Sequence, residues 1–387
     1  MGGAIKHSDY NVVKVSGGEG SNARWSAEDY VIKPIDGFGD PMSLRLALAE
    51  VKPDALFLFT DPRFFVWVWE MEDEVHDVCP IVYNHVWDEE PYPDYNSAFY
   101  EATDLINCIS WKTYNLVQPH FPEKTNYVPH ALYDNVYKPL DQSEVDEFKR
   151  NILGENRADH FVAFWNSRNA RRKRPGDLLH SWRLFLDKLQ ETHGHQKATF
   201  IMHTDPLDNE GPNLYKVIEL LKLENNVMLS KEKLEFDKMN VLYNIADVTL
   251  SASSAEGFGL STLESLYACT PIIVPKTGGL TTQVINRETN EEYGIGLDPD
   301  VRSLVGSQST PHIFELFTNN QNYSNAIYKM FSMSHAERKE IGSRGRQYAL
   351  REFNMKNLIE TWDRTLTETI TNFKKNKHLP RYKVMEL

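Results

Sequence analysis

Short apolar runs alternate with amphipathic stretches along most of this chain. In the first 140 residues, helical patterns such as Met42–Val51 and Phe64–Val75 lie between these runs. The runs expected to form strands are Tyr10–Val15, Ala55–Phe59, Ile81–His85, Leu105–Ile109 and Asn126–Val128. Such alternation is typical of βαβ units stacked around a parallel sheet, so the pattern predicts an α/β fold.

A second alternating series follows the first. Pro139, in the loop Tyr137–Leu140, ends the first series, and the polar stretch Asp141–Asp159 is predicted to be a linker with a short helix. The expected strands are Phe161–Trp165, Thr199–Met202, Val227–Leu229, Val248–Leu250 and Pro271–Val274. The expected helices are Asp177–Leu189, Leu214–Leu221, Phe236–Ile245 and Leu260–Ala268.

The two series indicate two domains, because 387 residues are too many for one compact core. We expect one domain over residues 1–140 and another over 141–354. Residues 355–387 hold a final helix, about Met355–Phe373, and a tail. The helix carries apolar side chains at four-residue spacing, and this stripe needs a surface that covers it.

The start of the chain looks abbreviated for such a fold. A doubly wound domain normally opens with a strand, a glycine-rich turn and a helix. Here the strand Tyr10–Val15 comes almost at once, and no helical pattern follows Gly17, Gly18 and Gly20. We interpret these glycines as a turn after a second strand, with the usual first strand missing.

Charge and cysteine content narrow the function classes. The net charge is −13, and residues 1–140 hold 22 acidic and 10 basic side chains. A surface that grips a nucleic-acid backbone needs a positive footprint, so the first half disfavours DNA or RNA binding. No apolar run approaches a membrane span, and the three cysteines lack metal-ligand spacing. We therefore expect a cytoplasmic protein.

A dense cationic loop follows the first strand of the second series. The segment Asn166–Arg174 holds four arginines and one lysine, among them Arg168 and Lys173. A diphosphate requires such a clamp, because arginine pairs with phosphate oxygens bidentately and lysine supplies a point charge. A solvated basic loop, or a nucleic-acid contact, is the alternative.

The most specific signal is a glycine-rich turn between a strand and a helix, which we call the Glu256 turn. Glu256 precedes Gly257, Phe258, Gly259 and Leu260, and Glu264 lies on the helix that follows. Glycines allow a close approach of backbone to ligand, and a helix N-terminus offers N–H groups to an anion. We assign Glu264 to ribose hydroxyls and Glu256 to a donor sugar; a capping carboxylate and an exposed helix residue are the structural alternative.

Several polar residues lie at predicted strand ends, where α/β sheets carry functional groups. His85 ends one strand of the first series, and we expect it to face the sugar. His130 has a similar position, while His203 and Ser230 end strands of the second series and are expected in the nucleotide pocket. Histidines hydrogen-bonded within loops are the alternative for His85 and His130.

Other catalytic schemes find no support. The sequence has neither a Gly-x-x-x-x-Gly-Lys-Ser/Thr loop nor a Gly-x-Ser-x-Gly elbow, which disfavours a P-loop nucleotidase and an α/β-hydrolase. The triplet Asp298-Pro299-Asp300 could hold a divalent metal, but its place in a polar loop favours a turn. We therefore do not expect a metal at this triplet.

At these motifs the chain resembles the retaining glycosyltransferases of family 4, which have the GT-B fold of two facing Rossmann-like domains. The resemblance is strongest from Phe161 to Val284. It rests on the cationic loop, on Tyr243 with Ala246-Asp247-Val248, on the Glu256 turn, on Glu264 and on Gly278-Gly279-Leu280. The segments His85-Val86-Trp87-Asp88 and Arg171–Asp177 look more like the branch encoded by tailed phages and large DNA viruses.

This resemblance implies a deep interdomain cleft, with the acceptor on the first domain and a nucleotide sugar on the second. It implies a final helix that crosses back onto the first domain, and transfer with retention of anomeric configuration. It also implies no metal and no other cofactor, because basic side chains and helix dipoles replace a metal. Catalytic roles fall on Glu256, Arg168, Lys173 and His85. Donor binding falls on Glu264, Gly257, Phe258, Gly259, Leu260, His203 and Ser230. The acceptor would be a glycan, a lipid or a protein, in the host cytoplasm if the protein is viral.

Two departures keep other functions open. The family's glycine-rich loop after its first strand is not evident, and Gln283 stands where the family often places Glu. One alternative is glycosylation of a modified base in viral DNA, which the acidic first half disfavours. Another is a non-catalytic relative that only binds nucleotide sugars.

Overall fold

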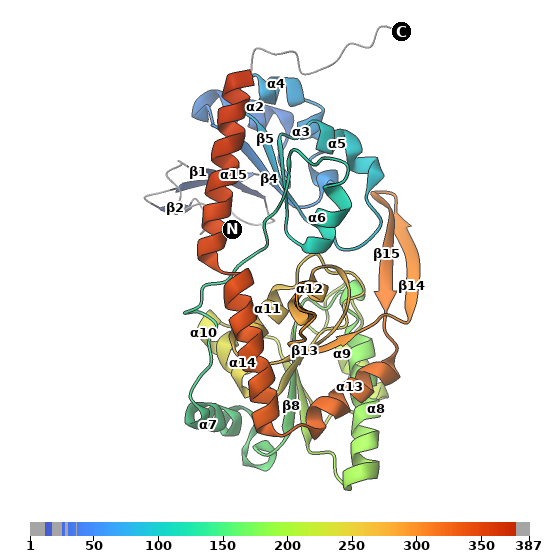
Figure 1. Cartoon of the computed structure of the whole chain (residues 1–387). Helices are drawn as coiled ribbons and strands as arrows, with labels where there is room; N and C mark the ends of the chain where they lie inside the picture. The colour runs from blue at the N-terminus through green and yellow to red at the C-terminus, as the bar shows by residue number, and fades with distance from the viewer. Residues whose placement is uncertain (1–11, 18–24, 28–29, 36, 377–387) are drawn as a thin grey trace.

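The computed structural model describes residues 12–17, 25–27, 30–35 and 37–376. Two lobes lie one above the other, each built around a parallel sheet (Figure 1). None of the helices within these residues is long and apolar enough to cross a bilayer.

The sheet of the first lobe contains β4 (Leu56–Phe59), β5 (Ile81–His85), β6 (Leu105–Cys108) and β7 (Thr125–Tyr127) in that order. All neighbours pair in parallel, as the pattern predicts. The helices around it are α2 (Pro41–Val51), α3 (Val66–Trp69), α4 (Glu72–His76), α5 (Ser97–Glu101) and α6 (Trp111–Val117). The helix predicted over Phe64–Val75 is broken, because Met71 leaves the helical backbone between α3 and α4.

The sheet of the second lobe has six parallel strands in the order β10-β9-β8-β11-β12-β13. They are β8 (Phe161–Asn166), β9 (Ala198–His203), β10 (Val227–Ser230), β11 (Val248–Leu250), β12 (Ile272–Pro275) and β13 (Gly294–Leu297). The first five match the predicted strands to within two residues at either end. The sequence analysis did not predict β13.

Both faces of this sheet are covered, which explains why its strands are apolar throughout. On β8, Val162 and Phe164 point into a core shared with α10 (Phe236–Ile245) and α11 (Leu260–Tyr267). Ala163 and Trp165 point the other way, into a core with α8 (Pro175–His193) and α13 (Asn320–Ser332). Two further helices of this lobe are α9 (Leu214–Leu220) and α12 (Thr281–Val284).

The predicted linker is folded onto the second lobe. Its helix, α7 (Gln142–Leu153), buries Val145 and Leu153 in the core that contains α10. Just before it, the Lys138 and Leu140 backbone N–H groups donate to Asn240 and Asn244 of α10, at 3.0 and 2.8 Å. The boundary near residue 140 therefore lies in a segment tied to the second lobe; the limits of the two domains stay a prediction.

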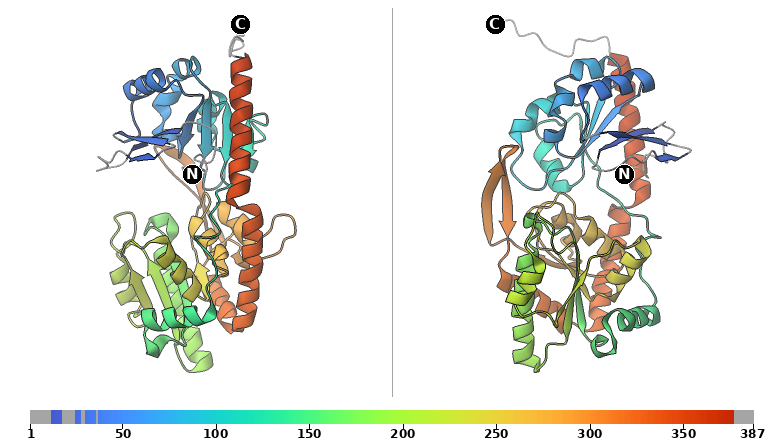
Figure 2. Two further views of the ribbon diagram at one scale, coloured as in Figure 1. Left: turned by 90° about the vertical axis from the view of Figure 1, so that its left-hand side faces the viewer. Right: turned by 180° about the vertical axis from the view of Figure 1, so that it is seen from behind.

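The C-terminal helices form a rod along one side of both lobes (Figure 2). Here α14 (His335–Glu352) packs on the second lobe, and α15 (Met355–Asn376) crosses back to the first. Leu358 and Trp362 of α15 share a core with Val82, Leu105 and Val128 of the first lobe. The predicted apolar stripe thus finds its surface on the first sheet.

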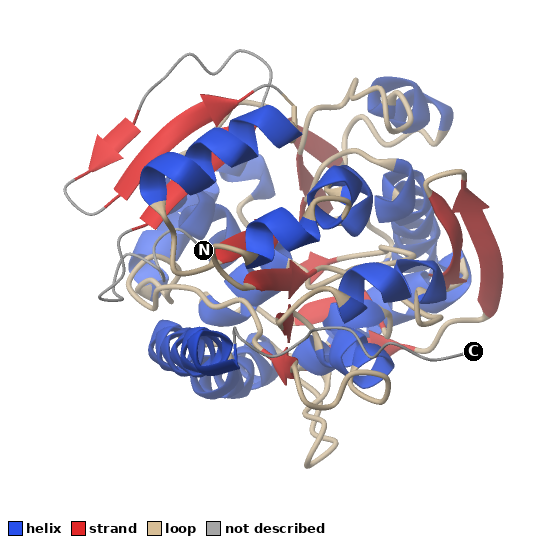
Figure 3. Cartoon of the chain, turned by 90° about the horizontal axis from the view of Figure 1, so that it is seen from above, coloured by secondary structure: helices blue, strands red, loops and turns tan. Residues whose placement is uncertain are grey.

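A two-stranded hairpin escaped the sequence analysis. β14 (Val301–Ser307) and β15 (Thr310–Phe317) pair antiparallel and lie at the edge of the molecule when it is seen from above (Figure 3). The Phe314 N–H donates to Glu90 O of the first lobe at 2.7 Å, and the Leu316 N–H donates to Ser254 O of the second at 2.8 Å. The hairpin therefore connects both lobes beside the Glu256 turn.

The triplet Asp298-Pro299-Asp300 leads into this hairpin as a loop with a bend at Asp300. Asp300 accepts the backbone N–H of Asn319 at 2.7 Å, and Asp298 pairs with Lys276 at 3.0 Å. Within the described ranges, no three His, Cys, Asp or Glu side chains gather in a group that could hold a metal ion.

Near the N-terminus, β1 (Val12–Gly17), β2 (Trp25–Ala27) and β3 (Tyr30–Ile35) form a separate sheet in the order β1-β3-β2. The expected strand Tyr10–Val15 overlaps β1, and Gly17 is its last residue. Tyr10, Gly18 and Gly20 lie outside the described residues, so the interpretation of the glycine cluster as a turn stays a prediction.

Candidate functional site

The carboxyl ends of the six-stranded sheet gather the predicted nucleotide-side groups. Asn166, His203 and Ser230 end β8, β9 and β10, and strand register places them in one row. The His203 ring nitrogen Nδ1 lies 2.9 Å from Ser230 Oγ. In open α/β sheets ligands bind outside this edge, so the row marks one border of a candidate site.

The Glu256 turn continues this edge from β11 into α11. Gly259 has φ of +91°, in the region that favours glycine, and serves as the N-cap of α11 without a side chain to cap it. A side chain at Gly257 would press on Asp88 of the first lobe, whose Oδ1 would lie 2.9 Å from a Cβ. The N-terminal N–H groups of α11 thus lack a side-chain cap from Gly259, whose backbone conformation favours glycine.

The cationic loop meets this turn. Lys173 Nζ forms an ion pair with Glu256 Oε2, and the side chains of both are largely buried. Arg172 Nη1 donates to Ala255 O at 2.9 Å and lies 3.7 Å from the Glu256 carboxylate. The Ser254 N–H donates to Arg172 O at 2.8 Å, so the two segments are also joined through their backbones.

These charges fix the ionisation of Glu256. Burial opposes the charged carboxylate, but the positive charges of Lys173 and Arg172 and their hydrogen bonding outweigh it and lower the pKa of Glu256 below its ordinary value. Ser253 Oγ also donates to the carboxylate, at 3.1 Å. The turn therefore presents a carboxylate already held in its ionised form.

Arg168, the other predicted member of the clamp, faces elsewhere. Its guanidinium pairs with Asp208 at 2.7 and 3.0 Å, and its side chain is 64% exposed. Arg172 takes the place beside Glu256 that the sequence analysis gave to Arg168. The two arginines lie in one loop, and partners distant in sequence decide which of them turns inward.

Glu264, the carboxylate assigned to ribose hydroxyls in the sequence analysis, is held by side chains of α10 and β8. Tyr243 donates its hydroxyl to Glu264 Oε2 at 2.6 Å, and Asn166 Nδ2 lies 3.4 Å from the same oxygen. Burial raises the pKa of Glu264, against hydrogen bonds from Tyr243, Tyr137 and Asn166 that lower it. Glu264 therefore connects α11 with the end of β8, next to the row that contains His203.

Phe258 and Leu260 differ from each other in exposure. The Phe258 ring is buried and makes edge contacts with His130 at 5.0 Å and Phe353 at 5.7 Å. Leu260 is 47% exposed at the start of α11. For Phe258, only the backbone is in a position to serve a ligand.

Gln283 forms hydrogen bonds with the backbone of the Glu256 turn. Its amide Nε2 donates to the carbonyls of Phe258 and Gly259 at 2.7 and 3.0 Å, while its Oε1 accepts the Thr262 hydroxyl at 2.5 Å. A carboxylate at this position has no proton to donate to the two carbonyls. The departure at Gln283 thus has a structural role within this turn.

His85 does not face the cleft, contrary to the prediction. Its ring is fully buried; Nε2 lies 2.7 Å from the Tyr100 hydroxyl and Nδ1 lies 3.4 Å from that of Tyr83. Burial lowers the pKa of His85 to about 3, so the ring stays neutral. The physical reason is that every residue of β5 is covered, and α5 supplies Tyr100 over the strand end.

The groups that reach the Glu256 turn from the first lobe come just after His85. The Glu256 N–H donates to Asp88 O at 3.3 Å. In the adjoining Gly278 segment, Glu89 Oε2 accepts the Gly278 N–H at 2.7 Å and the Thr277 hydroxyl at 2.8 Å, and Lys112 pairs with Glu89 and Glu90 at 3.0 and 2.8 Å. The sequence analysis missed Glu89, Glu90 and Arg172. For Glu89 and Glu90, the available signal was the acidic run Asp88-Glu89-Glu90, which begins three residues after a buried strand.

Hairpin β14–β15 also holds the cationic loop. Arg171 donates to Glu315 of β15 through both terminal nitrogens, at 3.0 and 2.6 Å, and Glu315 is 4% exposed. Arg302 of β14 reaches Glu90 at 2.8 Å. Because no hairpin was predicted, neither contact could be.

Comparisons with known proteins agree with this arrangement. Residues 146–296 match the family model of the group 1 glycosyl transferases. This segment contains the cationic loop, the Glu256 turn, Glu264 and Gln283. A search of curated protein sequences finds no match.

Solved structures share the fold over most of the chain. Sucrose-phosphate synthase from Thermosynechococcus elongatus aligns with a TM-score of 0.73 at 14% identity, over 95% of this chain and 91% of its own. HepE of Anabaena, in complex with UDP and glucose, gives 0.64 at 18% identity, over 87% and 86%. A UDP-forming trehalose-phosphate synthase from Burkholderia xenovorans gives 0.65 at 11% identity, over 92% and 93%. The chain therefore has the GT-B fold.

Proposed function

We propose that this chain is a metal-independent glycosyltransferase, which moves a sugar from a nucleoside diphosphate donor to an acceptor hydroxyl with retention of configuration. The observation that carries the proposal is the meeting of Lys173 and Arg172 with Glu256 at the uncapped start of α11. The match of residues 146–296 to group 1 glycosyl transferases and the UDP and glucose bound by Anabaena HepE support it.

The cationic groups suit the leaving group of this reaction. When the bond between the anomeric carbon and the phosphate breaks, negative charge develops on the nucleoside diphosphate. Lys173, Arg172 and the N–H groups of α11 provide positive charge and donors that are already in place. Lys173 would exchange its Glu256 contact for the diphosphate, which leaves the Glu256 carboxylate to accept sugar hydroxyls.

The other groups divide the donor between them. Glu264, held by Tyr243, accepts ribose hydroxyls, and His203 and Ser230 line the part of the site that holds the nucleotide. For retention, the acceptor oxygen attacks the face from which the diphosphate departs, and the departing phosphate oxygen takes up the acceptor proton. No base from the protein is needed in this scheme, which agrees with the buried position of His85.

The acceptor we propose is a glycan, a lipid or a protein rather than DNA. Residues 1–140 hold 22 acidic and 10 basic side chains, and this excess of negative charge repels a phosphodiester backbone. Steep salt-dependent binding to duplex DNA would instead favour glycosylation of a modified base in viral DNA.

The test is turnover of nucleotide sugars. The protein is incubated with UDP-glucose and other nucleotide sugars, with simple glycosides as acceptors, and release of nucleoside diphosphate is measured with and without EDTA. We expect release that EDTA does not reduce, and proton NMR of the product should show the anomeric configuration of the donor. Binding of UDP without any release would identify a non-catalytic relative, and an inverted product would refute retention.

A further inference from the structure

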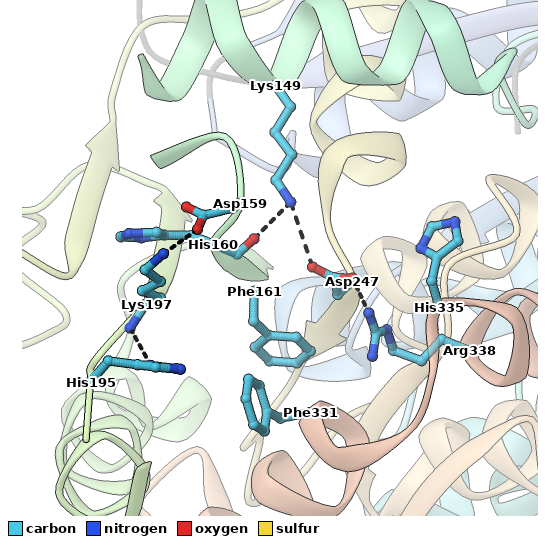
Figure 4. A pocket seen from close by; sticks show the side chains of 10 residues that line it. All are labelled: Lys149, Asp159, His160, Phe161, His195, Lys197, Asp247, Phe331, His335 and Arg338. Carbon is cyan, nitrogen blue, oxygen red and sulfur yellow. Dashed lines mark hydrogen bonds and ion pairs between the residues drawn. The ribbon is translucent and has the colours of Figure 1, made fainter. Parts of the chain in front are cut away.

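One cavity lies away from the Glu256 turn, among residues of α7, α14 and the starts of β8 and β9. It has a volume of about 460 Å³ and opens at the amino ends of β8 and β9, the opposite end of the same sheet (Figure 4). A smaller cavity of about 130 Å³ shares Lys149, Asp247, His335 and Arg338 with it. The proposed donor site therefore does not account for this space.

Three basic side chains lie in its walls. Lys149 comes from α7, Lys197 precedes β9, and Arg338 comes from α14. The acidic groups of the lining are Asp159 and Asp247, and the remaining polar residues are His160, His195 and His335. With neutral histidines the lining carries three positive and two negative charges, in a chain whose net charge is −13.

One of the two carboxylates is fully engaged in the fold. Asp247 accepts the Val162 N–H at 2.8 Å and Arg338 Nη2 at 2.8 Å, and Lys149 lies 3.9 Å from it. It thereby fixes α14 and α7 to the start of β8. Two cations that converge on one carboxylate leave positive charge uncompensated there.

The other carboxylate is only loosely held. Asp159 pairs with Lys197, but the two side chains are 57% and 55% exposed. Solvent screens such a pair, so a competing anion displaces the carboxylate at little cost. Lys149 Nζ, which donates to His160 O at 2.7 Å, has further N–H bonds for an incoming oxygen.

The floor of the cavity is aromatic. The rings of Phe161 and Phe331 meet edge to face at 5.6 Å, and the Arg338 guanidinium lies 5.5 Å from the Phe161 ring centroid. Figure 4 shows both rings below Lys149 and beside Arg338. A ligand that fits has an anionic head for the cations and a small carbon skeleton for the rings.

We propose that this cavity is a second ligand site, which binds a small phosphate ester at the end of the sheet remote from the donor. Its phosphate group contacts Lys149 and Lys197 and displaces Asp159, and its carbon skeleton packs on Phe161 and Phe331. This site is independent of the proposed transferase activity, because none of its residues belongs to the Glu256 turn or the cationic loop.

The exposed Lys197–Asp159 pair allows a test in two opposite directions. Glycerol 3-phosphate is titrated into the full chain at constant ionic strength, with binding followed by calorimetry. Lys197→Gln should weaken binding about fivefold, as expected for one unit charge about 4 Å from the phosphate in water. Asp159→Asn should tighten binding by a similar factor, because the competing carboxylate is gone.

Lys216→Gln is the matched control, since Lys216 is also an exposed lysine in an ion pair, with Glu219 on α9. It should bind glycerol 3-phosphate as the parent chain does, and all three variants should fold because the substituted side chains are more than half exposed. Equal affinity in the parent chain and both Lys197→Gln and Asp159→Asn would overturn the proposal. So would competition between glycerol 3-phosphate and UDP for one site.

Discussion

The two ends of the six-stranded sheet carry the same kind of ion pair in different surroundings. At the carboxyl end, Lys173 meets Glu256, and their side chains are 14% and 12% exposed. At the amino end, Lys197 meets Asp159, and both side chains are more than half exposed. The residue types are similar, so the contrast isolates the effect of solvent.

The contrast indicates which of the two ion pairs stays in place and which can separate when a ligand binds. A buried pair is fixed by its surroundings and leaves a costly unpaired group when one partner is removed, whereas an exposed pair contributes little to stability. The Lys173–Glu256 pair can therefore hold a site ready for a ligand. The Lys197–Asp159 pair can open for one without disturbing the fold.

The largest effect should come from removing the buried cation. Lys173→Ala should weaken UDP binding by ~2–4 kcal/mol, because a charge-assisted contact to the diphosphate is lost in a largely buried site. Isothermal titration with UDP measures the change. Arg168→Ala is the matched control from the same loop, and it should change the affinity less than about threefold because Arg168 pairs with Asp208 in solvent.

Equal losses of UDP affinity for Lys173→Ala and Arg168→Ala would contradict the arrangement in which Lys173 faces the Glu256 turn and Arg168 faces solvent. They would restore the clamp that the sequence predicts, with Arg168 turning toward the diphosphate when the donor binds. No loss in either variant would remove the cationic loop from donor binding.

A second effect concerns stability and pH at the buried end. Because the folded pKa of Glu256 is below its unfolded value, its ionised form contributes stability at pH values above about 4.5, the ordinary pKa of the carboxyl, and this contribution is lost as the pH falls through the folded pKa. Glu256→Gln should lower the free energy of unfolding at pH 7 by about 1–2 kcal/mol, since Lys173 is left largely buried without its partner. Urea unfolding from pH 7 to pH 3 should show the difference from the parent chain shrinking with acid.

Glu219→Gln serves as the control for this series, because Glu219 pairs with Lys216 on the surface three residues away. Its unfolding should follow the parent chain within experimental error across the same range. A Glu256→Gln deficit that stays constant from pH 7 to pH 3 would show that the deficit does not depend on the charge of Glu256.

The sequence predicted the second sheet well because its pattern is local. The strand Phe161–Asn166 is a continuous run of mostly apolar residues, and Gly259 has a φ of +91°, which favours glycine. These constraints act within a few residues. Such local constraints can be recognised from neighbouring residues in the sequence.

The parts that failed depend on distant partners. Nothing near Arg168 says that Asp208 will hold it outward, and nothing near His85 says that Tyr100 will cover it. Hairpin β14–β15 is half exposed and owes its place to Glu90 and Ser254, far away in the chain. Side-chain direction in loops and at strand ends is set by tertiary contacts, which a single sequence does not display.

The smallest effect on stability is expected for the Lys197–Asp159 pair at the amino end of the sheet. Its size tests whether solvent exposure alone accounts for the difference between the two ion pairs. Lys197→Gln and Asp159→Asn should each change the free energy of unfolding by less than about 0.5 kcal/mol at pH 7, because the pair is screened and each side chain gives up rotamer freedom to form it. The hydrogen bond from Lys197 holds the pKa of Asp159 below its ordinary value, so the small contribution is present above the unfolded pKa and is lost in acid. Urea unfolding of the double variant completes the cycle and gives the coupling energy directly. A coupling energy above about 1 kcal/mol would mean that the pair stabilises the start of β9. An incoming anion could then not displace Asp159 at little cost, which would contradict the proposed binding of a phosphate ester in the cavity.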